Sequence, residues 1–339
     1  MTGELTPIKD RLLEIVRTFP KRKIVIIGDS IADRFLYGSI SRVSREAPVF
    51  ILRHEQTETV PGGAANCAVN LASLGAEVAL VSVVGNDEAG LELRTKLQAA
   101  GVDTSSLLTS DKLQTTTKVR ILAGQTHSSR QQVIRVDYED APISDPDLRE
   151  AIVNELTRRT AEASAVIVSD YNYGAVNETA VDVLREVTRT RQLPVLVDSR
   201  FRLSSFGGLT SATPNEDEVE HLLQAPITST EQLESTATEL KRKLDYRALL
   251  VTRGANGMML LEGDEPPLHI AAVGAHQPVD VTGAGDTVIA TFALALASNS
   301  SFSDAARLAN YAGGLVVMKR GTASITAHEL EHSIINFET

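Results

Sequence analysis

The sequence predicts an α/β fold: a doubly wound, mostly parallel sheet flanked by helices, with a small β-sheet lid. Short apolar runs of strand length alternate with longer segments of helical periodicity, which is typical of a parallel sheet buried on both faces. A few other segments break this rhythm, because they alternate in polarity like half-exposed strands. These segments predict the lid.

The central strands are expected where the apolar runs lie. The first run is followed by a turn at Gly28-Asp29, and the full set is Lys23 to Gly28, Glu77 to Val84, Ala165 to Ser169, Pro194 to Val197 and Ala248 to Thr252. Helical patterns fill the intervals at Gly63 to Leu74, Asp87 to Ala100, Asp145 to Glu162, Asn177 to Thr190, Thr230 to Leu244 and Ser303 to Met318. Open α/β sheets bind ligands at the carboxyl ends of their strands, so we expect the site there.

The lid is expected to comprise residues 38–60 and 113–137, which contain the polarity-alternating segments. No internal repeat, low-complexity segment or linker divides the chain, so residues 1–339 are predicted to form a single domain. An exposed lid with open strand edges commonly pairs with a second copy of the chain. We therefore expect a homodimer through the lid.

Composition narrows the function class. The 339 residues are 42% hydrophobic and 23% charged, which suits a globular enzyme with a large core. The net charge of -11 argues against nucleic acid as a partner. Cys67 is the single cysteine, charged residues interrupt the N-terminal segment, and no apolar run reaches transmembrane length. We therefore expect a cytoplasmic protein that binds no membrane.

The run from Asp280 to Asp286 is the most informative feature. Gly283, Ala284 and Gly285 allow several backbone N–H groups to converge, and the helix predicted to follow adds its positive dipole end, so this cradle suits a phosphate. A carboxylate beside an anion site is expected where it acts as the base for a nucleophile. An aspartate in water has a pKa of about 3.9, so we expect Asp286 to be ionised at neutral pH. The run predicts phosphoryl transfer to an alcohol.

A second glycine-rich run places Gly62 and Gly63 just before Asn66, at the start of a predicted helix. Glycines permit close backbone approach to a polar ligand, although a simple loop with a helix cap gives the same pattern. Asp29 and Asp33 follow the first strand and could accept hydrogen bonds from the vicinal hydroxyls of a sugar. A turn residue and a solvated side chain are the alternative readings for these two carboxylates.

Two later segments follow predicted strands. Asn215 and Glu218 open a helix rich in acid, which is typical of N-capping; they could also organise waters around a Mg²⁺ ion. Thr252, Gly254 and Gly257 form either a hairpin turn or a loop over a nucleotide. Basic residues gather around the first turn and the lid, where they could hold a second phosphate on the substrate: Arg34, Arg42, Arg45, Lys118, Arg120, Arg130 and Arg135.

One motif points to another class of enzyme. His328 to His332 matches His-Glu-x-x-His, a helical zinc pair with a general base, which would indicate a metalloprotease. The alternative is a solvated C-terminal helix that carries the pattern by chance.

The two glycine-rich runs resemble the two signatures of the PfkB (ribokinase-like) carbohydrate kinases, and the resemblance extends over almost the whole chain. The first is met from Gly62 to Gly85 and the second from Asp280 to Ala290, with Thr291 where a smaller residue is usual. Within that family, several segments resemble the heptose 7-phosphate kinases of the ADP-heptose pathway: Gly28-Asp29, Asp33-Arg34, Ser41 to Val49, Thr117 to Arg120 and Lys319 to Ala323.

The resemblance implies transfer of the ATP γ-phosphoryl group to the anomeric hydroxyl of D-glycero-D-manno-heptose 7-phosphate. It makes Asp286 the base and Gly283, Ala284 and Gly285 the anion hole. It implies that the sugar and its phosphate are bound by Asp29, Asp33, Arg34, Gly62, Gly63, Asn66, Lys118 and Arg120. It implies a nucleotide site formed by Asp198, Arg200, Asn215, Thr252, Gly254 and Gly257. Glu218 would support Mg²⁺ through water, and Asp280 and Thr282 a monovalent cation such as K⁺.

The chain also departs from those kinases. They usually carry Asp-Tyr-x-Lys-Gly and Asp-Pro-Lys, whereas this chain has Tyr173 in place of the first lysine and Ser199-Arg200 in place of Pro-Lys. Two alternatives therefore stay open. One is a kinase of the same family for a ketohexose, ribose or a 2-keto-3-deoxy acid, and the other is a non-catalytic sugar-binding regulator.

Overall fold

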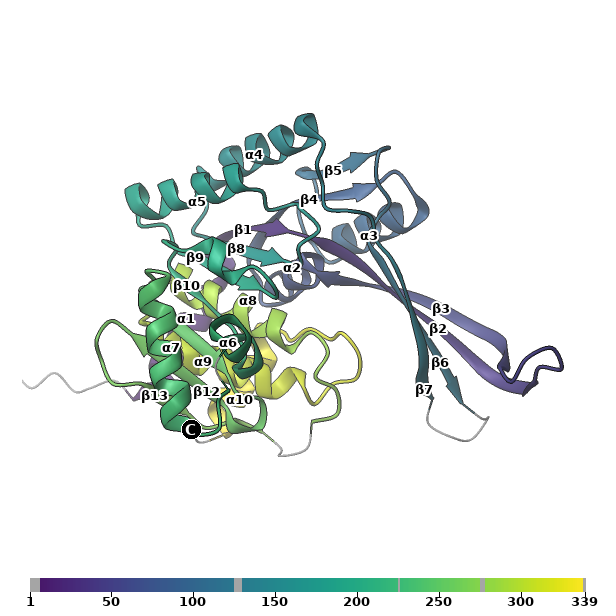
Figure 1. The fold of residues 1–339 in the computed structure, drawn as a ribbon. Coiled ribbons are helices and arrows are strands. Elements are labelled where there is room, and N and C mark those ends of the chain that lie inside the picture. Colours follow the sequence, from purple (N-terminus) through teal and green to yellow (C-terminus); the bar gives the residue numbers. More distant parts are fainter. Residues whose placement is uncertain (1–6, 125–129, 225, 275–277, 338–339) are drawn as a thin grey trace, which may run out of the picture.

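The computed structural model describes residues 7–124, 130–224, 226–274 and 278–337. Within these residues, the main sheet has nine strands in the order β13-β12-β11-β10-β9-β8-β1-β4-β5 (Figure 1). The strands are β1 Lys23–Gly28, β4 Glu77–Gly85, β5 Leu107–Ser110, β8 Ala165–Asp170, β9 Val195–Ser199, β10 Ser211–Ala212, β11 Ala248–Thr252, β12 Met258–Glu262 and β13 Leu268–Ile270. Strands β11 through β5 pair in parallel, and β12 and β13 add an antiparallel edge. The predicted mostly parallel sheet is confirmed.

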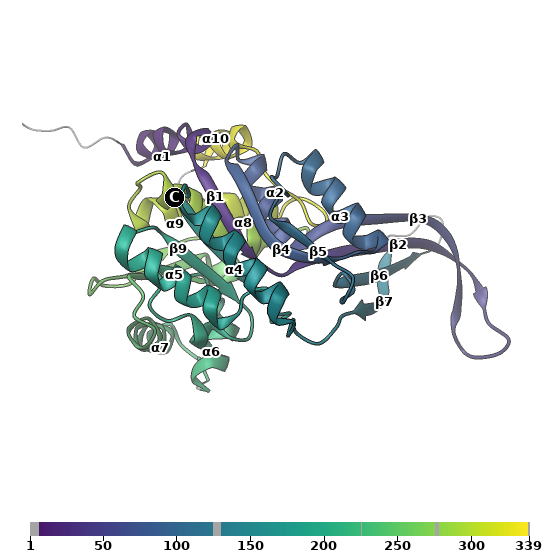
Figure 2. The same ribbon diagram turned by 90° about the horizontal axis from the view of Figure 1, so that it is seen from above.

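Helices cover both faces of this sheet (Figure 2). One face carries α1 Ile8–Val16, α2 Ala64–Ser73, α3 Glu88–Ala99, α8 Ala284–Ala297, α9 Phe302–Val316 and α10 Ala327–Asn336. The other carries α4 Pro146–Thr160, α5 Glu178–Arg191, α6 Glu216–Leu223 and α7 Thr230–Lys243. Alternation along β1 explains its apolar run after the exposed Lys23: Ile24 and Ile26 join the first core, and Val25 and Ile27 join the second.

A smaller sheet projects from the body as an arm (Figure 1). This small sheet has the order β3-β2-β6-β7, formed by β2 Ser30–Val43, β3 Phe50–Gly63, β6 Thr117–Gly124 and β7 Gln131–Tyr138. Its first strand begins at Ser30, earlier than the expected boundary at residue 38. Residues 30–33 are all buried at the base of the arm, so this part of the strand lacks the half-exposed pattern from which the lid was predicted.

Strand order fixes where a ligand site can form. Strand β1 lies between β8 and β4, so successive crossovers leave it in opposite directions and open a crevice at its carboxyl end. The residues after β1, β8 and β9 meet there, next to the N-termini of α2 and α8. The helices of the described part of the chain are all too short or too polar to cross a membrane.

Candidate active site

Asp286 lies in the first turn of α8 and is 6% exposed. One oxygen, Oδ2, accepts a hydrogen bond of 2.6 Å from the Asn66 side-chain amide, and Oδ1 is buried without a hydrogen-bond partner among the described residues. Burial raises the pKa of Asp286 to about 7; the Asn66 amide opposes this shift, and the negative charge of Asp33 adds to it. The expectation of an ordinary, fully ionised aspartate is wrong, because the sequence does not reveal that burial.

The cradle before Asp286 has the geometry of an anion site. Gly283 is the N-cap of α8 with φ 76°, a left-handed conformation that favours glycine. The first i to i−4 hydrogen bond of α8 runs from the Thr287 N–H to the Gly283 carbonyl, 3.2 Å. The N–H groups of Gly285 and Asp286 precede that bond, so they point out of the helix end. Because Ala284 has a small side chain and Gly285 has none, little side-chain volume covers these N–H groups.

Asn66 is fixed by two further polar side chains. The Asn70 amide donates to the Asn66 side-chain oxygen (3.2 Å) and to its backbone carbonyl (3.0 Å). The Thr287 hydroxyl donates to the Asn70 side-chain oxygen (2.7 Å). Asn66, Asn70 and Thr287 are each at most 3% exposed. Asn66, which was expected from the sequence to contact the sugar, therefore contacts Asp286 directly.

Asp29 binds backbone rather than solvent. Its two carboxylate oxygens accept hydrogen bonds from the N–H groups of Tyr171, Tyr173 and Ala175 at 2.8–3.0 Å. Burial raises the pKa of Asp29, and the three N–H donors oppose that shift. This geometry favours a role for Asp29 in shaping the loop 171–175 over the direct sugar contact expected from the sequence.

Asp33 stands on β2 next to the glycine run. A Cβ atom on Gly62 would lie 2.4 Å from Asp33 Oδ2, and one on Gly63, where φ is 57°, would lie 2.6 Å from the Asp29 carbonyl oxygen. Glycine is needed at both positions because the chain approaches these groups closely. Asp33 Oδ1 pairs with the guanidinium of Arg120, whose cation also lies 5.4 Å from the Phe35 ring.

Arg34 points to the opposite face of the strand from Asp33, because neighbours in a strand alternate. Its guanidinium donates to Glu92 of α3 at 3.2 Å and to Thr59 at 3.3 Å. The structure thus separates Arg34 from the other expected sugar-binding residues. Two further cations of the predicted basic set also have carboxylate partners, Arg130 with Glu55 and Arg135 with Asp137.

Lys118 differs from those arginines. It shares the inner face of the small sheet with Asp33, and its ammonium lies 6.0 Å from the ring centroids of both Tyr171 and Tyr173. No carboxylate of the described residues forms an ion pair with it. Burial lowers the pKa of Lys118; Asp137 partly opposes this, and Arg135 and Arg200 reinforce it. A half-buried, unpaired ammonium beside other cations is suited to an anionic ligand.

Asp198, at the end of β9, faces the cradle: its Oδ2 lies 3.9 Å from the position of a Cβ on Gly285. Burial and the charges of Asp286 and Glu218 raise the pKa of Asp198, and Arg200 opposes the shift.

Glu218 and Asn215 form the capping box of α6, with hydrogen bonds of 2.9 and 2.8 Å. The helix-capping alternative therefore describes their local contacts, and the carboxylate of Glu218 still faces the same crevice.

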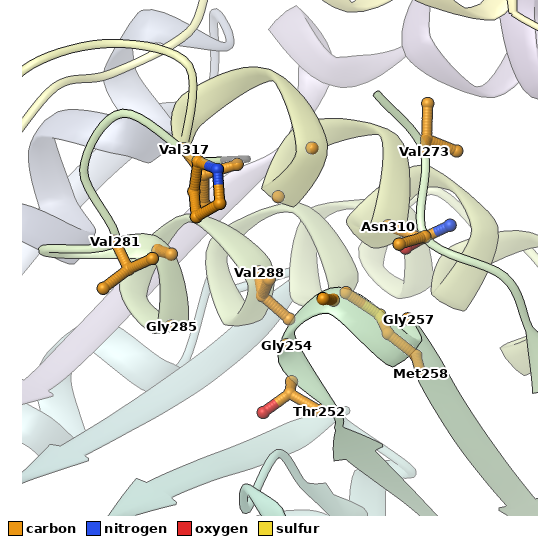
Figure 3. Close-up of a pocket in the computed structure, with 16 residues that line it drawn as sticks. Thr252, Gly254, Gly257, Met258, Val273, Val281, Gly285, Val288, Asn310 and Val317 are labelled. Carbon is orange, nitrogen blue, oxygen red and sulfur yellow. The ribbon is translucent and has the colours of Figure 1, made fainter. Parts of the chain in front are cut away.

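An apolar cavity of about 220 Å³ opens next to the cradle (Figure 3). It contains three of the expected nucleotide residues, Thr252, Gly254 and Gly257, together with Gly285. Sequence reasoning missed its remaining walls, which include Val273, Val281, Val288, Asn310, Gly313, Gly314 and Val317. The adjacent glycines within α9 were the available signal, because a Cβ on Gly314 would lie 2.1 Å from the Val273 carbonyl oxygen.

The residues that differ from the heptose kinase pattern make local contacts. The Ser199 hydroxyl donates to the buried Asp170 at 2.7 Å, and Arg202, which sequence reasoning missed, pairs with the same carboxylate. The Tyr173 hydroxyl donates to Glu139 at 2.6 Å. Arg200 is exposed and lies over the Phe201 ring.

Asp280 connects two loops beside the cradle. It accepts hydrogen bonds from the N–H groups of Thr282 and Gly321, each 2.9 Å. Burial works against ionisation, but these donors hold the pKa of Asp280 below its usual value. Asp280 thus supplies a fixed negative charge next to the exposed Thr282.

The His-Glu-x-x-His segment lies in α10. Glu329 completes a capping box with Thr326 and forms an ion pair with Lys319 at 2.7 Å, and the His332 ring lies next to Asn336. Leu330 and Ile334 are fully buried, so the helix is solvated on one face only. Searched over the described residues, the structure contains no group of three potential ligands for a metal ion.

Comparison with known proteins identifies the family. The model described as pfkB family carbohydrate kinase matches residues 21–329. The chain therefore belongs to the pfkB family, and it is a sugar kinase. The resemblance inferred from the two glycine-rich runs is confirmed.

Among curated relatives, the bifunctional protein HldE of Hahella chejuensis is 39% identical over 317 residues, and that of Pseudomonas aeruginosa is 41% identical over 317 residues. The match covers 93% of this chain and 64% of each relative, so the chain spans under two thirds of their length.

Solved structures of low identity share the fold. A ribokinase of Arabidopsis thaliana, complexed with ribose and ATP, is 20% identical with a TM-score of 0.73, covering 94% of this chain and 99% of that one. Phosphofructokinase-2 of Escherichia coli, in complex with potassium, is 17% identical with a TM-score of 0.73, covering 93% and 98%. The ribokinase-like fold class is confirmed.

Proposed function

We propose that this sugar kinase transfers the γ-phosphoryl group of ATP to the anomeric hydroxyl of D-glycero-D-manno-heptose 7-phosphate, with Asp286 as the general base. One observation carries the proposal: a buried carboxylate with a pKa of about 7 adjoins an anion cradle, and the unpaired Lys118 lies beside Tyr171, whose pKa is raised by the charge of Asp286. The HldE relatives support the heptose phosphate, because they are similar over 93% of this chain.

Asp286 Oδ1 is the proton acceptor, since it has no protein partner among the described residues and Oδ2 is held by Asn66. The anomeric oxygen gives its proton to Oδ1 and forms a bond to the γ-phosphorus, while the bond from that phosphorus to the bridging oxygen of ADP breaks. The N–H groups at the start of α8 stabilise the charge on the transferring group. A base of this kind contributes roughly 10²–10⁴-fold to the rate.

The apolar cavity behind Gly285 would take the adenine and ribose of ATP, since its walls are formed mostly by glycine and valine. Lys118 would bind the 7-phosphate, because its ammonium has no carboxylate partner among the described residues. Arg120 supports this site by pairing with Asp33.

Two cations fit the residues present. Asp198 and Glu218 give the crevice a surplus of negative charge that suits Mg²⁺, which neutralises phosphate charge when it is bound. Glu218 would hold that ion through water. Asp280 and the exposed loop at Thr282 would hold a monovalent cation such as K⁺.

The test is an ADP-release screen with MgATP against phosphorylated and free sugars. We expect turnover with heptose 7-phosphate and at least roughly tenfold lower kcat/KM for sugars without a phosphate, because an unpaired ammonium is left without its anion. Turnover confined to a free ketohexose, ribose or a 2-keto-3-deoxy acid would contradict the substrate. Tight sugar binding without ADP release from any sugar would favour the non-catalytic regulator.

We further propose that two copies associate through the small sheet. Strand β7 is exposed along its length, and its exposed apolar side chains Val133, Ile134, Val136 and Tyr138 lie on an outer edge of that sheet. We expect light scattering after size exclusion to give twice the chain mass of 36.4 kDa, and Ile134→Lys to give the single mass. If the wild-type protein at about 50 µM has the mass of one chain, this proposal is contradicted.

A further inference from the structure

A closed ring of buried hydrogen bonds connects α2 with α8. It runs from the Thr287 hydroxyl to the Asn70 oxygen (2.7 Å), from the Asn70 amino group to the Asn66 oxygen (3.2 Å), and from the Asn66 amino group to Asp286 Oδ2 (2.6 Å). The peptide bond between Asp286 and Thr287 closes the ring. Two of its members, Asn70 and Thr287, are 0% exposed and lie outside the set of residues expected to contact a ligand.

The ring determines which end of the Asn66 amide faces the carboxylate. Two acceptors of Asn66, its side-chain oxygen and its backbone carbonyl, lie next to the amino group of Asn70. If the Asn66 amide turned over, its amino group would meet another amino group, and its oxygen would meet the carboxylate of Asp286. Both contacts are repulsive, and buried groups cannot turn to water instead.

We propose that Asn70 and Thr287 are positioning residues: they hold the Asn66 amide so that its N–H group stabilises the ionised form of Asp286. This inference rests on the proposed role of Asp286 as the base. Because the amide donates to the charged carboxylate, it keeps Asp286 ionised at a lower pH than burial alone would allow.

Other titratable groups also face Asp286, and they come from each neighbouring element. They are Asp33 of β2, Cys67 of α2, Tyr171 after β8 and Asp198 of β9. None of them belongs to the ring, and each either carries a negative charge or is neutral near pH 7. The charge of Asp33 disfavours the charged carboxylate and the Asn66 hydrogen bond favours it, whereas the Cys67 thiol and the Tyr171 phenol are neutral near pH 7 and add no charge.

The test compares pH profiles of kcat/KM, which report the pKa values of the free enzyme, in three variants. Asn70→Leu has a similar volume and no amide, and we expect the acid limb of its profile to move up by about one pH unit, the size expected for one hydrogen bond to a charged group. From a starting pKa of about 7, kcat/KM then falls roughly fivefold at pH 7 and hardly at all at pH 9. Thr287→Val should move the limb in the same direction by less, and Thr287→Ser should restore the wild-type profile.

Thr291→Val is the matched control. Thr291 is buried in the same helix, but its hydroxyl donates only to the Thr287 backbone carbonyl at 2.8 Å, so the acid limb should stay in place. Circular dichroism and thermal melting establish that each variant is folded. Folded Asn70→Leu and Thr287→Val proteins with an unmoved acid limb would overturn the proposal, as would a Thr291→Val protein that moves it equally.

A second readout does not depend on turnover. Carbon-13 labelling of the aspartates allows the Asp286 carboxyl to be titrated by NMR in the absence of substrates, with its signal assigned by its loss in Asp286→Asn. The same upward shift in Asn70→Leu supports the ring, and an identical titration in wild type and variant refutes it. A protein in which the ring behaves as expected, but which phosphorylates no sugar, would refute the proposed function alone.

Discussion

Replacing Asp286 by asparagine is expected to lower kcat by roughly 10²–10⁴-fold while leaving sugar binding within about threefold of wild type. The amide cannot take the proton of the anomeric hydroxyl, but its oxygen can still accept the hydrogen bond from Asn66. Steady-state kinetics and calorimetric titration with the sugar measure the two quantities. Turnover within tenfold of wild type would remove Asp286 from its proposed role.

The same change is expected to stabilise the fold at alkaline pH. The folded-state pKa of Asp286, about 7, lies above the value of about 3.9 for an unfolded chain. A carboxyl with a raised pKa contributes stability that is complete below about pH 4 and is lost as the pH rises through 7. Asparagine avoids this loss, so we expect the free energy of unfolding at pH 8 to rise by roughly 2–4 kcal/mol, and much less at pH 5.

Urea unfolding at both pH values measures this effect. Asp304→Asn is the matched control, because Asp304 is also 6% exposed but pairs with Arg11 at 2.9 Å. It should lose stability and keep normal turnover. A lower stability of Asp286→Asn at pH 8 would show that the carboxylate is not strained by burial.

Lys118→Met is expected to raise KM for a phosphorylated sugar about 30-fold and to leave KM for ATP unchanged. Methionine keeps the length and apolar packing of the side chain between the rings of Tyr171 and Tyr173 but removes the charge. The loss corresponds to one hydrogen bond to a charged group, about 2 kcal/mol. Initial rates with both substrates varied give the two constants.

Lys112→Met is the control for this prediction, because Lys112 is an exposed lysine paired with Asp145 outside the crevice. It should leave both KM values unchanged. If Lys118→Met instead weakens ATP and leaves the sugar unaffected, the ammonium belongs to the nucleotide site and the assignment of the 7-phosphate is wrong.

The sequence predicted the elements that have a clear period. The helices around residues 63–74, 87–100 and 177–190, for example, agree with α2, α3 and α5 within one or two residues. The short strands β5, β10 and β13 were missed, because two to four residues are too few to show any period. The base of β2 was missed because its residues are buried on both sides.

Prediction of the site worked best where backbone conformation restricts the residue type. Gly63 and Gly283 have positive φ and adjoin Asp29 and Asn66, so their glycines carried the signal. Side-chain partners could not be predicted in the same way. That Arg34 faces α3 depends on strand register, and that Thr287 donates to Asn70 depends on the packing of two helices far apart in sequence.

The proposed reaction phosphorylates the anomeric oxygen of an already phosphorylated heptose. Phosphorus NMR of the product formed from heptose 7-phosphate and MgATP tests it most directly. We expect a second phosphorus signal that couples to the anomeric proton, formed together with one ADP per sugar and at least roughly 10²-fold more slowly with Asp286→Asn. A new phosphate on any other hydroxyl, or ADP formed without a phosphorylated product, would refute the proposed reaction.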